Sequence, residues 1–302
     1  MPYNSLSNPD YLLFAQHGWS DIGNDIGYLG RATATENAVV IAPSLGLLKT
    51  YWRIANLVKQ VEQIAAAAIS QNPTTELRIM GHSMGGLIWL EVLDRHPEWW
   101  EKVHSLVVIG SPIAGAHLAK AIDPLGLGIG IARDLGKNRR TLAEKVAQHI
   151  PTLSIAGELG NGTDGMVTTE ATKFAGAKTV IVPKVPHARL KCHLGLVPII
   201  REFWTNPQIT KQSQDLATKI IRQLQQVPGI TDADYRWFKE SRIALNLSEG
   251  ITIRTHTNKA QIDRVFVADS RGNCLYAGYV GWLHKLELKR AVANLKTQYT
   301  NK

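Results

Sequence analysis

The stretch of sequence that decides the fold is Leu77-Arg-Ile-Met-Gly-His-Ser-Met-Gly-Gly86. Its first half is a short apolar run, which is typical of a buried strand, and residues 85–95 then repeat apolar side chains at helical spacing. Ser83 lies between Gly81 and Gly85 in the order Gly-x-Ser-x-Gly. A sharp turn from strand to helix needs neighbours without side chains, because the two elements come close together there. The stretch therefore predicts a strand, a strained turn that projects Ser83, and a helix.

Short apolar runs alternate with longer helix-like segments from Tyr11 to about Trp204, which is typical of a parallel sheet covered by helices. The helical spacing is clearest in residues 51–70. The predicted strands are residues 11–15, 38–42, 77–80, 105–109, 152–155 and 178–182. The fold class expected from this order is α/β, with a mostly parallel sheet and helices on both faces.

Residues 113–150 interrupt this alternation and indicate an inserted cap. The insertion contains the glycine-rich run Leu125-Gly-Leu-Gly-Ile-Gly-Ile-Ala132, followed by a short amphipathic helix at residues 138–149. The glycines follow no strand and lack the full Gly-x-Gly-x-x-Gly spacing, so they do not indicate a dinucleotide site.

A second region begins near residues 205–210, where the pattern changes to a small α+β extension. Residues 209–226 predict a polar amphipathic helix that ends before Pro228-Gly229. Four alternating segments then predict an antiparallel meander, and residues 285–296 predict a closing helix. The meander strands are residues 243–247, 251–255, 265–268 and 275–280. The expected domains are residues 1–204 and 205–302.

The composition indicates a globular protein without a metal or cofactor. The chain has 302 residues with 44% hydrophobic content, which is enough to bury a large core. Its histidines form no His-Glu-x-x-His set, and neither Cys192 nor Cys274 belongs to a Cys-x-x-Cys pair. The apolar run at residues 11–15 is too short for a signal-peptide core, so a cytoplasmic location without a membrane span is expected.

Positive charge is concentrated in the later part of the sequence. Residues 1–110 hold 7 Lys/Arg against 10 Asp/Glu, whereas residues 111–302 hold 27 against 15. The basic residues are scattered, which favours a solvated surface, and no recognisable nucleic-acid-binding motif is present. Peripheral contact with an anionic membrane surface is the open alternative.

Three segments resemble the α/β-hydrolase superfamily and are most similar to its bacterial lipases and esterases. They are Gln16-His-Gly-Trp19, Gly81-His-Ser-Met-Gly-Gly86 and Thr163-Asp-Gly-Met-Val167, within a resemblance that covers about residues 8–204. The resemblance implies the α/β-hydrolase fold with Ser83 as nucleophile. It also implies an oxyanion hole formed by the backbone N–H groups of Trp19 and Met84, which would stabilise the tetrahedral oxyanion.

A serine hydroxyl needs a histidine base, which in turn needs a carboxylate to orient it, and the expected chain order is serine, acid, histidine. Asp164 is the preferred acid because it lies in the loop after the predicted strand at residues 152–157, with Glu158 as the nearest alternative. His187 and His193 compete as base. The Val-x-His-x-x-Leu setting at residues 185–190 is similar to that of lipases and favours His187.

The expected function is that of a serine esterase or lipase-like enzyme that cleaves an acyl ester through an acyl-enzyme. The apolar insertion and the basic second half favour a lipid-like ester. Thioesterase and acyltransferase chemistry use the same residues and stay open. A further alternative is an inactive hydrolase fold that serves as a binding or scaffold module.

Overall fold

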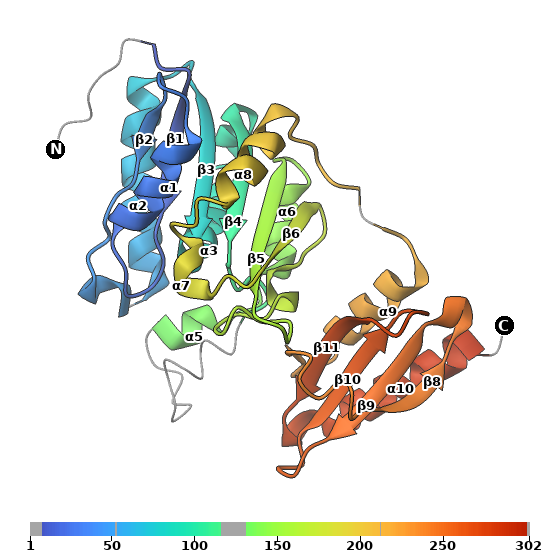
Figure 1. The fold of residues 1–302 in the computed structure, drawn as a ribbon. Helices are drawn as coiled ribbons and strands as arrows, with labels where there is room; N and C mark the ends of the chain where they lie inside the picture. Colours follow the sequence, from blue (N-terminus) through green and yellow to red (C-terminus); the bar gives the residue numbers. More distant parts are fainter. Residues whose placement is uncertain (1–7, 52, 116–130, 212, 301–302) are drawn as a thin grey trace. The chain divides into compact units, whose positions relative to one another are not determined.

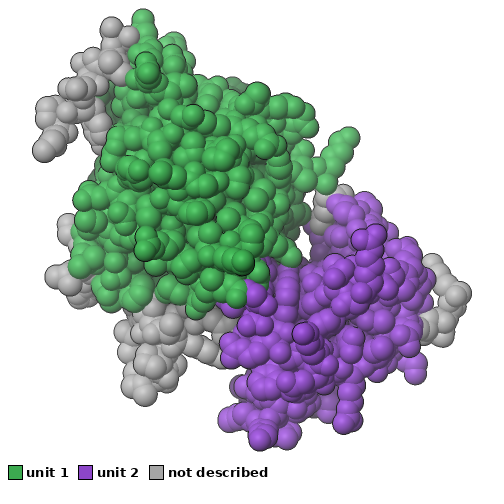
Figure 2. Space-filling view, in the orientation of Figure 1, with its two compact units in different colours: residues 1–159, 164–167, 172–211 green, residues 160–163, 168–171, 212–302 purple. Residues whose placement is uncertain are grey.

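A computed structural model describes residues 8–51, 53–115, 131–211 and 213–300. The chain divides into two compact units, which are coloured separately in Figure 2. Unit 1 comprises residues 1–159, 164–167 and 172–211, and unit 2 comprises residues 160–163, 168–171 and 212–302. Within the described ranges, no helix is long and apolar enough to cross a membrane.

Unit 1 is built on a six-stranded sheet in the order β2-β1-β3-β4-β5-β6, and all of its strand pairs are parallel. The strands are β1 (Tyr11–Gln16), β2 (Val39–Ile41), β3 (Glu76–His82), β4 (Val103–Ile109), β5 (Thr152–Glu158) and β6 (Ala177–Pro183). All six predicted strands are therefore confirmed, as is the α/β class. Because the strands are parallel, their carboxyl ends meet at one edge of the sheet, where the loops that follow them gather.

Helices cover both faces of this sheet (Figure 1). Successive residues of β1 show why, since Leu12 and Phe14 join one apolar cluster while Leu13 and Ala15 join the other. The first cluster includes residues of α2 (Ile54–Gln71), α3 (Met84–Arg95) and α6 (Arg140–Ala147). The second includes residues of α1 (Gly23–Thr33) and α8 (Leu196–Thr205). Strands buried on both faces read as continuous apolar runs, which is why the sequence reveals them.

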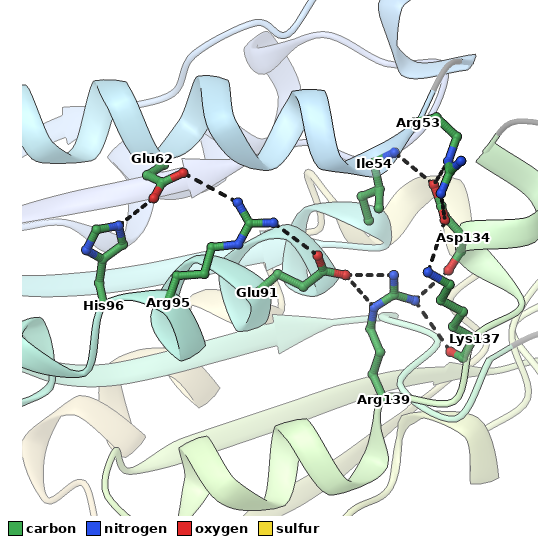
Figure 3. A network of polar contacts seen from close by, with 9 residues as sticks. All are labelled: Arg53, Ile54, Glu62, Glu91, Arg95, His96, Asp134, Lys137 and Arg139. Carbon is green, nitrogen blue, oxygen red and sulfur yellow. Dashed lines mark hydrogen bonds and ion pairs between the residues drawn. The ribbon is translucent and has the colours of Figure 1, made fainter.

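The predicted cap falls partly on residues 116–130, which lie outside the described residues. Its later part contains α5 (Ile131–Leu135) and α6, which falls within the predicted helix at residues 138–149. Figure 3 shows how polar contacts attach this part to α2 and α3. The buried carboxylate of Asp134 accepts hydrogen bonds from the Arg53 side chain and the Ile54 N–H, and Arg139 pairs with Glu91 at 2.7 Å. The described end of the insertion is thus anchored to α2 and α3.

Unit 2 contains a five-stranded sheet in the order β7-β11-β10-β9-β8, with every pair antiparallel. The strands are β7 (Thr231–Asp232), β8 (Arg242–Asn246), β9 (Thr252–Thr257), β10 (Asp263–Ala268) and β11 (Cys274–Val280). The meander and the closing helix α10 (Lys285–Thr300) are confirmed. The helix expected to begin at Ile209 is shorter, because α9 (Leu216–Gln225) begins where the Asp215 side chain accepts the Thr218 N–H and caps it.

The two faces of the unit 2 sheet are covered by different kinds of structure. On one face, α9 and α10 pack against Ile253, Val265 and Val267. On the other face, residues 233–238 pack against Phe266 and Ala277. Tyr235 also holds the two short segments that unit 2 takes from the middle of the chain, because its N–H donates to Asn161 O at 2.8 Å and its hydroxyl donates to Glu170 Oε1 at 2.6 Å.

Candidate active site

Ser83 occupies the turn between β3 and α3 in a strained backbone conformation. Its φ of 54° and ψ of −123° lie outside the regions that non-glycine residues favour. The turn is held because the Ser83 N–H donates to Ile109 O at 2.8 Å. A Cβ at Gly81 would lie 2.5 Å from Gly86 N, and one at Gly85 would lie 2.3 Å from Gln16 O. Both glycines are therefore required by close backbone approach, as the sequence predicted for this turn.

His187 lies between Ser83 and Asp164 and contacts both. Its Nδ1 is 2.6 Å from Asp164 Oδ2, and its Nε2 is 3.0 Å from Ser83 Oγ. A carboxylate only accepts hydrogen bonds, so Nδ1 carries the proton and donates it. Nε2 is then free to accept the hydrogen bond of the Ser83 hydroxyl. The three residues form a continuous chain of hydrogen bonds from acid to base to hydroxyl.

The loop after β5 fixes the position of the Asp164 carboxylate. Asp164 Oδ1 accepts the N–H of Met166 at 3.0 Å and the N–H of Val167 at 2.7 Å. The backbone of the same residue accepts the His187 N–H at 3.0 Å, which joins the two loops directly. One carboxylate oxygen is thus satisfied by backbone donors, and the other is left for the imidazole.

The three side chains lie in a water-poor environment, since Ser83 is 4% exposed, Asp164 2% and His187 5%. Low local polarity strengthens hydrogen bonds between charged and polar groups. An imidazolium that formed at His187 would therefore be stabilised by the adjacent Asp164 carboxylate more strongly than in water. The arrangement suits proton transfer from Ser83 Oγ to His187.

The segment from His17 to Trp19 passes beside the Ser83 turn. A Cβ at Gly18 would lie 2.8 Å from Ser83 Cβ and 3.4 Å from Met84 N, so only glycine allows this approach. The His17 ring holds the segment, because its Nδ1 donates to Gly18 O at 2.9 Å and its Nε2 accepts the Leu45 N–H at 2.9 Å. Burial lowers the pKa of His17, which keeps the ring neutral as this pairing requires.

His82 contacts both the backbone and the ring of His187. Its Nε2 donates to His187 O at 3.1 Å, and the two ring centres are 4.8 Å apart. Burial above all, and then the proximity of His187, hold the pKa of His82 well below its ordinary value. His82 is therefore a neutral hydrogen-bond donor. The sequence interpretation of His17 and His82 as hydrogen-bonding residues of the loop and turn agrees with these contacts.

The competing candidates lie elsewhere. His193 follows α7 (His187–Leu190), and its ring rests against its own neighbour Gly195. Glu158 ends β5, where its carbonyl accepts the Lys184 N–H. The structure thus brings Asp164 and His187 to Ser83, not Glu158 and His193.

Two glycines that make room for the site were not predicted from the sequence. A Cβ at Gly110, directly after β4, would lie 3.2 Å from the His187 ring atoms Cε1 and Nδ1. A Cβ at Gly157, within β5, would lie 3.0 Å from Asp164 Cβ. Each glycine lies at or near the carboxyl end of a predicted strand, and that position was the available signal.

No metal-binding arrangement is found among the residues that the structure describes, where no group of three or more His, Cys, Asp and Glu side chains could hold an ion. The site as described consists of the Ser83 hydroxyl, the His187 imidazole and the Asp164 carboxylate.

Comparison with known proteins supports the same fold. The model of a family described as the PGAP1-like alpha/beta domain matches residues 47–177, which include β3, the Ser83 turn and the Asp164 loop. A comparison with curated protein sequences finds no match. Among solved structures, the mature form of the lipase BlEst2 from Bacillus licheniformis is similar, with a TM-score of 0.50 at 15% identity. That match covers 67% of this chain and 96% of the lipase.

Two further solved structures are similar at low identity. Est1E from Butyrivibrio proteoclasticus, with ferulic acid bound, has a TM-score of 0.52 at 16% identity over 68% of this chain and 92% of its own. The propeptide form of BlEst2 has a TM-score of 0.54 at 14% identity and covers 90% of this chain and 66% of its own, so that match extends into unit 2. The chain has the α/β-hydrolase fold and is related to the α/β-hydrolase superfamily. Residues 47–177 are similar to the PGAP1-like alpha/beta domain.

Proposed function

We propose that this protein is a serine hydrolase that cleaves an acyl ester through an acyl-enzyme on Ser83. One observation carries the proposal, namely that His187 bridges Ser83 Oγ at 3.0 Å and Asp164 Oδ2 at 2.6 Å. This order of hydroxyl, imidazole and carboxylate is the one that activates a serine for nucleophilic attack. The lipase and esterase folds of the similar structures agree with this class of reaction.

In the first half of the reaction, Ser83 Oγ attacks the ester carbonyl carbon while its proton passes to His187 Nε2. Asp164 accepts the Nδ1 hydrogen bond throughout, so it keeps the correct tautomer and stabilises the imidazolium. The carbonyl oxygen becomes an oxyanion, which we assign to the N–H groups of Met84 and Trp19. Met84 begins α3, and Gly18 brings the preceding segment against Ser83. Loss of one such donor raises the barrier by about 3–4 kcal/mol.

In the second half, the tetrahedral intermediate collapses and the alcohol leaves with the proton from His187 Nε2. The acyl group is then bound to Ser83 Oγ as an ester. A water molecule gives a proton to His187 and attacks the acyl carbon, and the acid departs as the proton returns to Ser83. The residues already described supply each proton transfer, and no cofactor takes part in these steps.

A lipid-like ester is the substrate class that we propose. Two of the similar structures are described as a lipase and a phospholipase, the latter being PlaB from Legionella pneumophila, which has a TM-score of 0.51 at 12% identity and covers 67% of this chain and 60% of its own. The apolar sequence of residues 125–132 also favours an apolar acyl group. Thioesters and acyl transfer to another acceptor are the alternative reactions of the same three residues.

Hydrolysis of p-nitrophenyl esters with short and long acyl chains tests both reaction and substrate class. The native chain is expected to hydrolyse these esters, and Ser83→Ala is expected to reduce kcat by about 10⁶-fold. A fluorophosphonate should label the native chain but not Ser83→Ala. Absence of both hydrolysis and labelling in a folded native chain would favour a binding or scaffold module.

His193→Ala is the matched control for His187→Ala, since the two histidines lie six residues apart in sequence. Only the change at His187 is expected to abolish hydrolysis, because only that ring contacts Ser83 and Asp164. The opposite result would show that the base is misassigned. A steep preference for long over short acyl chains supports the lipid-like substrate, whereas a preference for the shortest chains contradicts it.

A further inference from the structure

Three neighbouring apolar side chains are strongly exposed where β11 leads into α10. Trp282 is 72% exposed, Leu283 89% and Leu286 62%. Every other exposed large apolar side chain among the described residues is at most 51% exposed. These three residues, named here the apolar knob, are therefore the strongest departure from apolar burial in the described chain.

Contacts on both sides of Leu283 hold the chain at the knob in place. Trp282 Nε1 donates to Ala260 O at 2.9 Å, which satisfies the polar atom of the indole and leaves its apolar surface exposed. The His284 ring packs against Gly229, at a place where a Cβ on that glycine would collide with it. Leu283 lies between these two residues in sequence, and its side chain is left exposed. The part of the knob that is already held in place loses little conformational entropy when a partner buries it.

The first turns of α10 continue the knob as an amphipathic surface. Leu288 is 3% exposed and packs into the core beneath the helix, so the opposite face points to solvent. Leu286 lies on that exposed face with Lys289 and Arg290, which are three and four residues further along and are both exposed. The cationic groups thus begin about one helical turn, or roughly 5 Å, from the apolar end.

Positive charge exceeds negative charge around the knob. Lys259 is exposed in the turn that holds Trp282, and it adds to the two cations on α10. Lys285 is 3.9 Å from Asp263, so these two charges offset each other. Glu287 is the other acidic residue in this part of the helix, and it is half-buried.

We propose that the apolar knob is a docking site for an anionic phospholipid bilayer, with Trp282, Leu283 and Leu286 entering the interface and Lys259, Lys289 and Arg290 contacting lipid phosphates. An apolar end followed by cations about one turn away matches the order of acyl region and headgroups in a leaflet. Tryptophan favours this boundary because its ring is apolar and its N–H is polar.

A bilayer explains the shape of this surface better than a protein partner does. The side chains lie at one end of a helix, and Leu283 at 89% exposure has few neighbours of its own. A protein partner would need a complementary pocket for such a projection, whereas lipid rearranges around it. The proposal does not depend on hydrolysis by Ser83. The charge distribution of the sequence left a membrane contact open as an alternative, and the proposal assigns that contact to unit 2.

Sedimentation of the full chain with vesicles tests the proposal. We compare vesicles of phosphatidylcholine with equimolar phosphatidylcholine and phosphatidylserine at the same total lipid. The native chain is expected to bind the anionic vesicles at least about tenfold more tightly than the neutral ones. Leu283→Ser with Leu286→Ser should weaken anionic binding by more than about tenfold. Lys289→Gln with Arg290→Gln should weaken it by roughly tenfold and reduce its dependence on salt.

Matched controls separate the knob from general apolar or basic character. Ile243→Ser changes another exposed apolar residue of unit 2, which is 51% exposed. Lys219→Gln with Arg271→Gln removes two exposed cations elsewhere in the same unit, the second in the turn at the opposite end of β10 and β11 from Trp282. Both control variants should bind vesicles like the native chain. Circular dichroism and urea unfolding should show that every variant is folded.

Several results would overturn the proposal. The knob is not a lipid site if the native chain binds neither vesicle, or if the Leu283 and Leu286 variant binds like the native chain. Equal binding to neutral and anionic vesicles would contradict the proposed contact of Lys259, Lys289 and Arg290 with lipid phosphates. Concentration-dependent dimerisation abolished by the same variant, without vesicle binding, would assign the knob to a second copy of this chain. Ser83→Ala should bind vesicles normally, which keeps this test separate from the proposed hydrolysis.

Discussion

Unit 1 and unit 2 both bury an apolar sheet and some polar side chains, but their most distinctive side chains lie in opposite environments. Unit 1 buries polar side chains at the carboxyl edge of its sheet, where Ser83, Asp164 and His187 meet. Unit 2 exposes large apolar side chains at Trp282 and Leu283. Parallel strands collect their following loops at one edge, which favours an enclosed site. In unit 2 the most exposed apolar residues follow the last strand of an antiparallel sheet. Their exposure is the reason for proposing that they contact a membrane.

The largest contrast should come from removing one buried carboxylate from each unit. Asp164→Asn is expected to lower kcat for p-nitrophenyl esters by about 10⁴-fold, because the amide cannot keep His187 in the required tautomer. Asp232→Asn, at a residue that is 5% exposed in unit 2, should lower the free energy of unfolding by about 1–3 kcal/mol without changing kcat of the folded chain. A comparable loss of kcat in both variants would contradict the assignment of the catalytic carboxylate to unit 1 alone.

Glycine replacements should distinguish close packing in unit 1 from an open turn in unit 2. Gly85→Ala places a Cβ 2.3 Å from Gln16 O, so we expect the free energy of unfolding to fall by more than about 3 kcal/mol. In Gly272→Ala the added Cβ meets nothing within 4 Å, so the backbone strain at its φ of +82° is the remaining cost. We expect the free energy of unfolding to fall by about 1 kcal/mol. Urea unfolding of both variants measures the difference, and equal costs would contradict the close approach at Ser83.

Tyr235→Phe tests how unit 2 holds its segments from the middle of the chain. Burial, with the charge of Glu170 beside it, raises the pKa of the Tyr235 phenol far above its ordinary value, so the group stays a neutral donor. Loss of this hydrogen bond to Glu170, a residue that is 2% exposed, should lower the free energy of unfolding by about 1–2 kcal/mol. Tyr299→Phe, whose hydroxyl accepts a 3.2 Å hydrogen bond from Gln223, is the control and should cost less than about 0.5 kcal/mol.

The smallest expected effect is the pH dependence caused by the buried histidines of unit 1. The pKa values of His82 and His17 are lowered in the folded chain, chiefly by burial. Their unfolded forms bind protons as the pH falls through about 6.5, whereas the folded forms resist. Stability is therefore fully present above this pH and decreases below it, by at most about 1.4 kcal/mol per pH unit for each group. His82→Gln should flatten this decrease in urea unfolding between pH 7.5 and 5.5.

His96→Gln provides the control of opposite sign. Burial alone would lower the pKa of His96, but hydrogen bonds with Glu98 and Glu62 raise it above its ordinary value. A raised folded pKa gives stability that is present at low pH and is lost as the pH rises through that value. Because the unfolded pKa is about 6.5, this stability is gained as the pH falls from the raised folded pKa toward 6.5 and is constant below 6.5. His96→Gln should therefore remove a gain above pH 6.5 and leave the decrease below pH 6.5 unchanged, and a flattening below pH 6.5 like that of His82→Gln would contradict the assigned causes.

Much of the fold was predictable because burial leaves a simple pattern in the sequence. Strands covered on both faces read as apolar runs, and all six were found. Helix α1 was missed because residues 23–33 contain three glycines and few large apolar side chains, Ile26 and Leu29 among them. Strand β7 has two residues, too few for any periodic signal. The start of α9 was predicted too early because the N-cap signal of Asp215, which marks the beginning of the helix, was overlooked.

The sequence by itself determined the Ser83 turn, because glycine is the residue that tolerates the backbone approaches measured at Gly81 and Gly85. It also determined the α/β class through the apolar runs. Only the tertiary structure decided which histidine faces Ser83, since His193 lies only six positions after His187 and both follow the same strand. That choice depends on the loop after β6, where the His187 N–H donates to Asp164 O and its ring enters the site. The exposure of Trp282, Leu283 and Leu286 was likewise decided by tertiary packing. The identity of an apolar residue does not by itself reveal whether the folded chain buries its side chain.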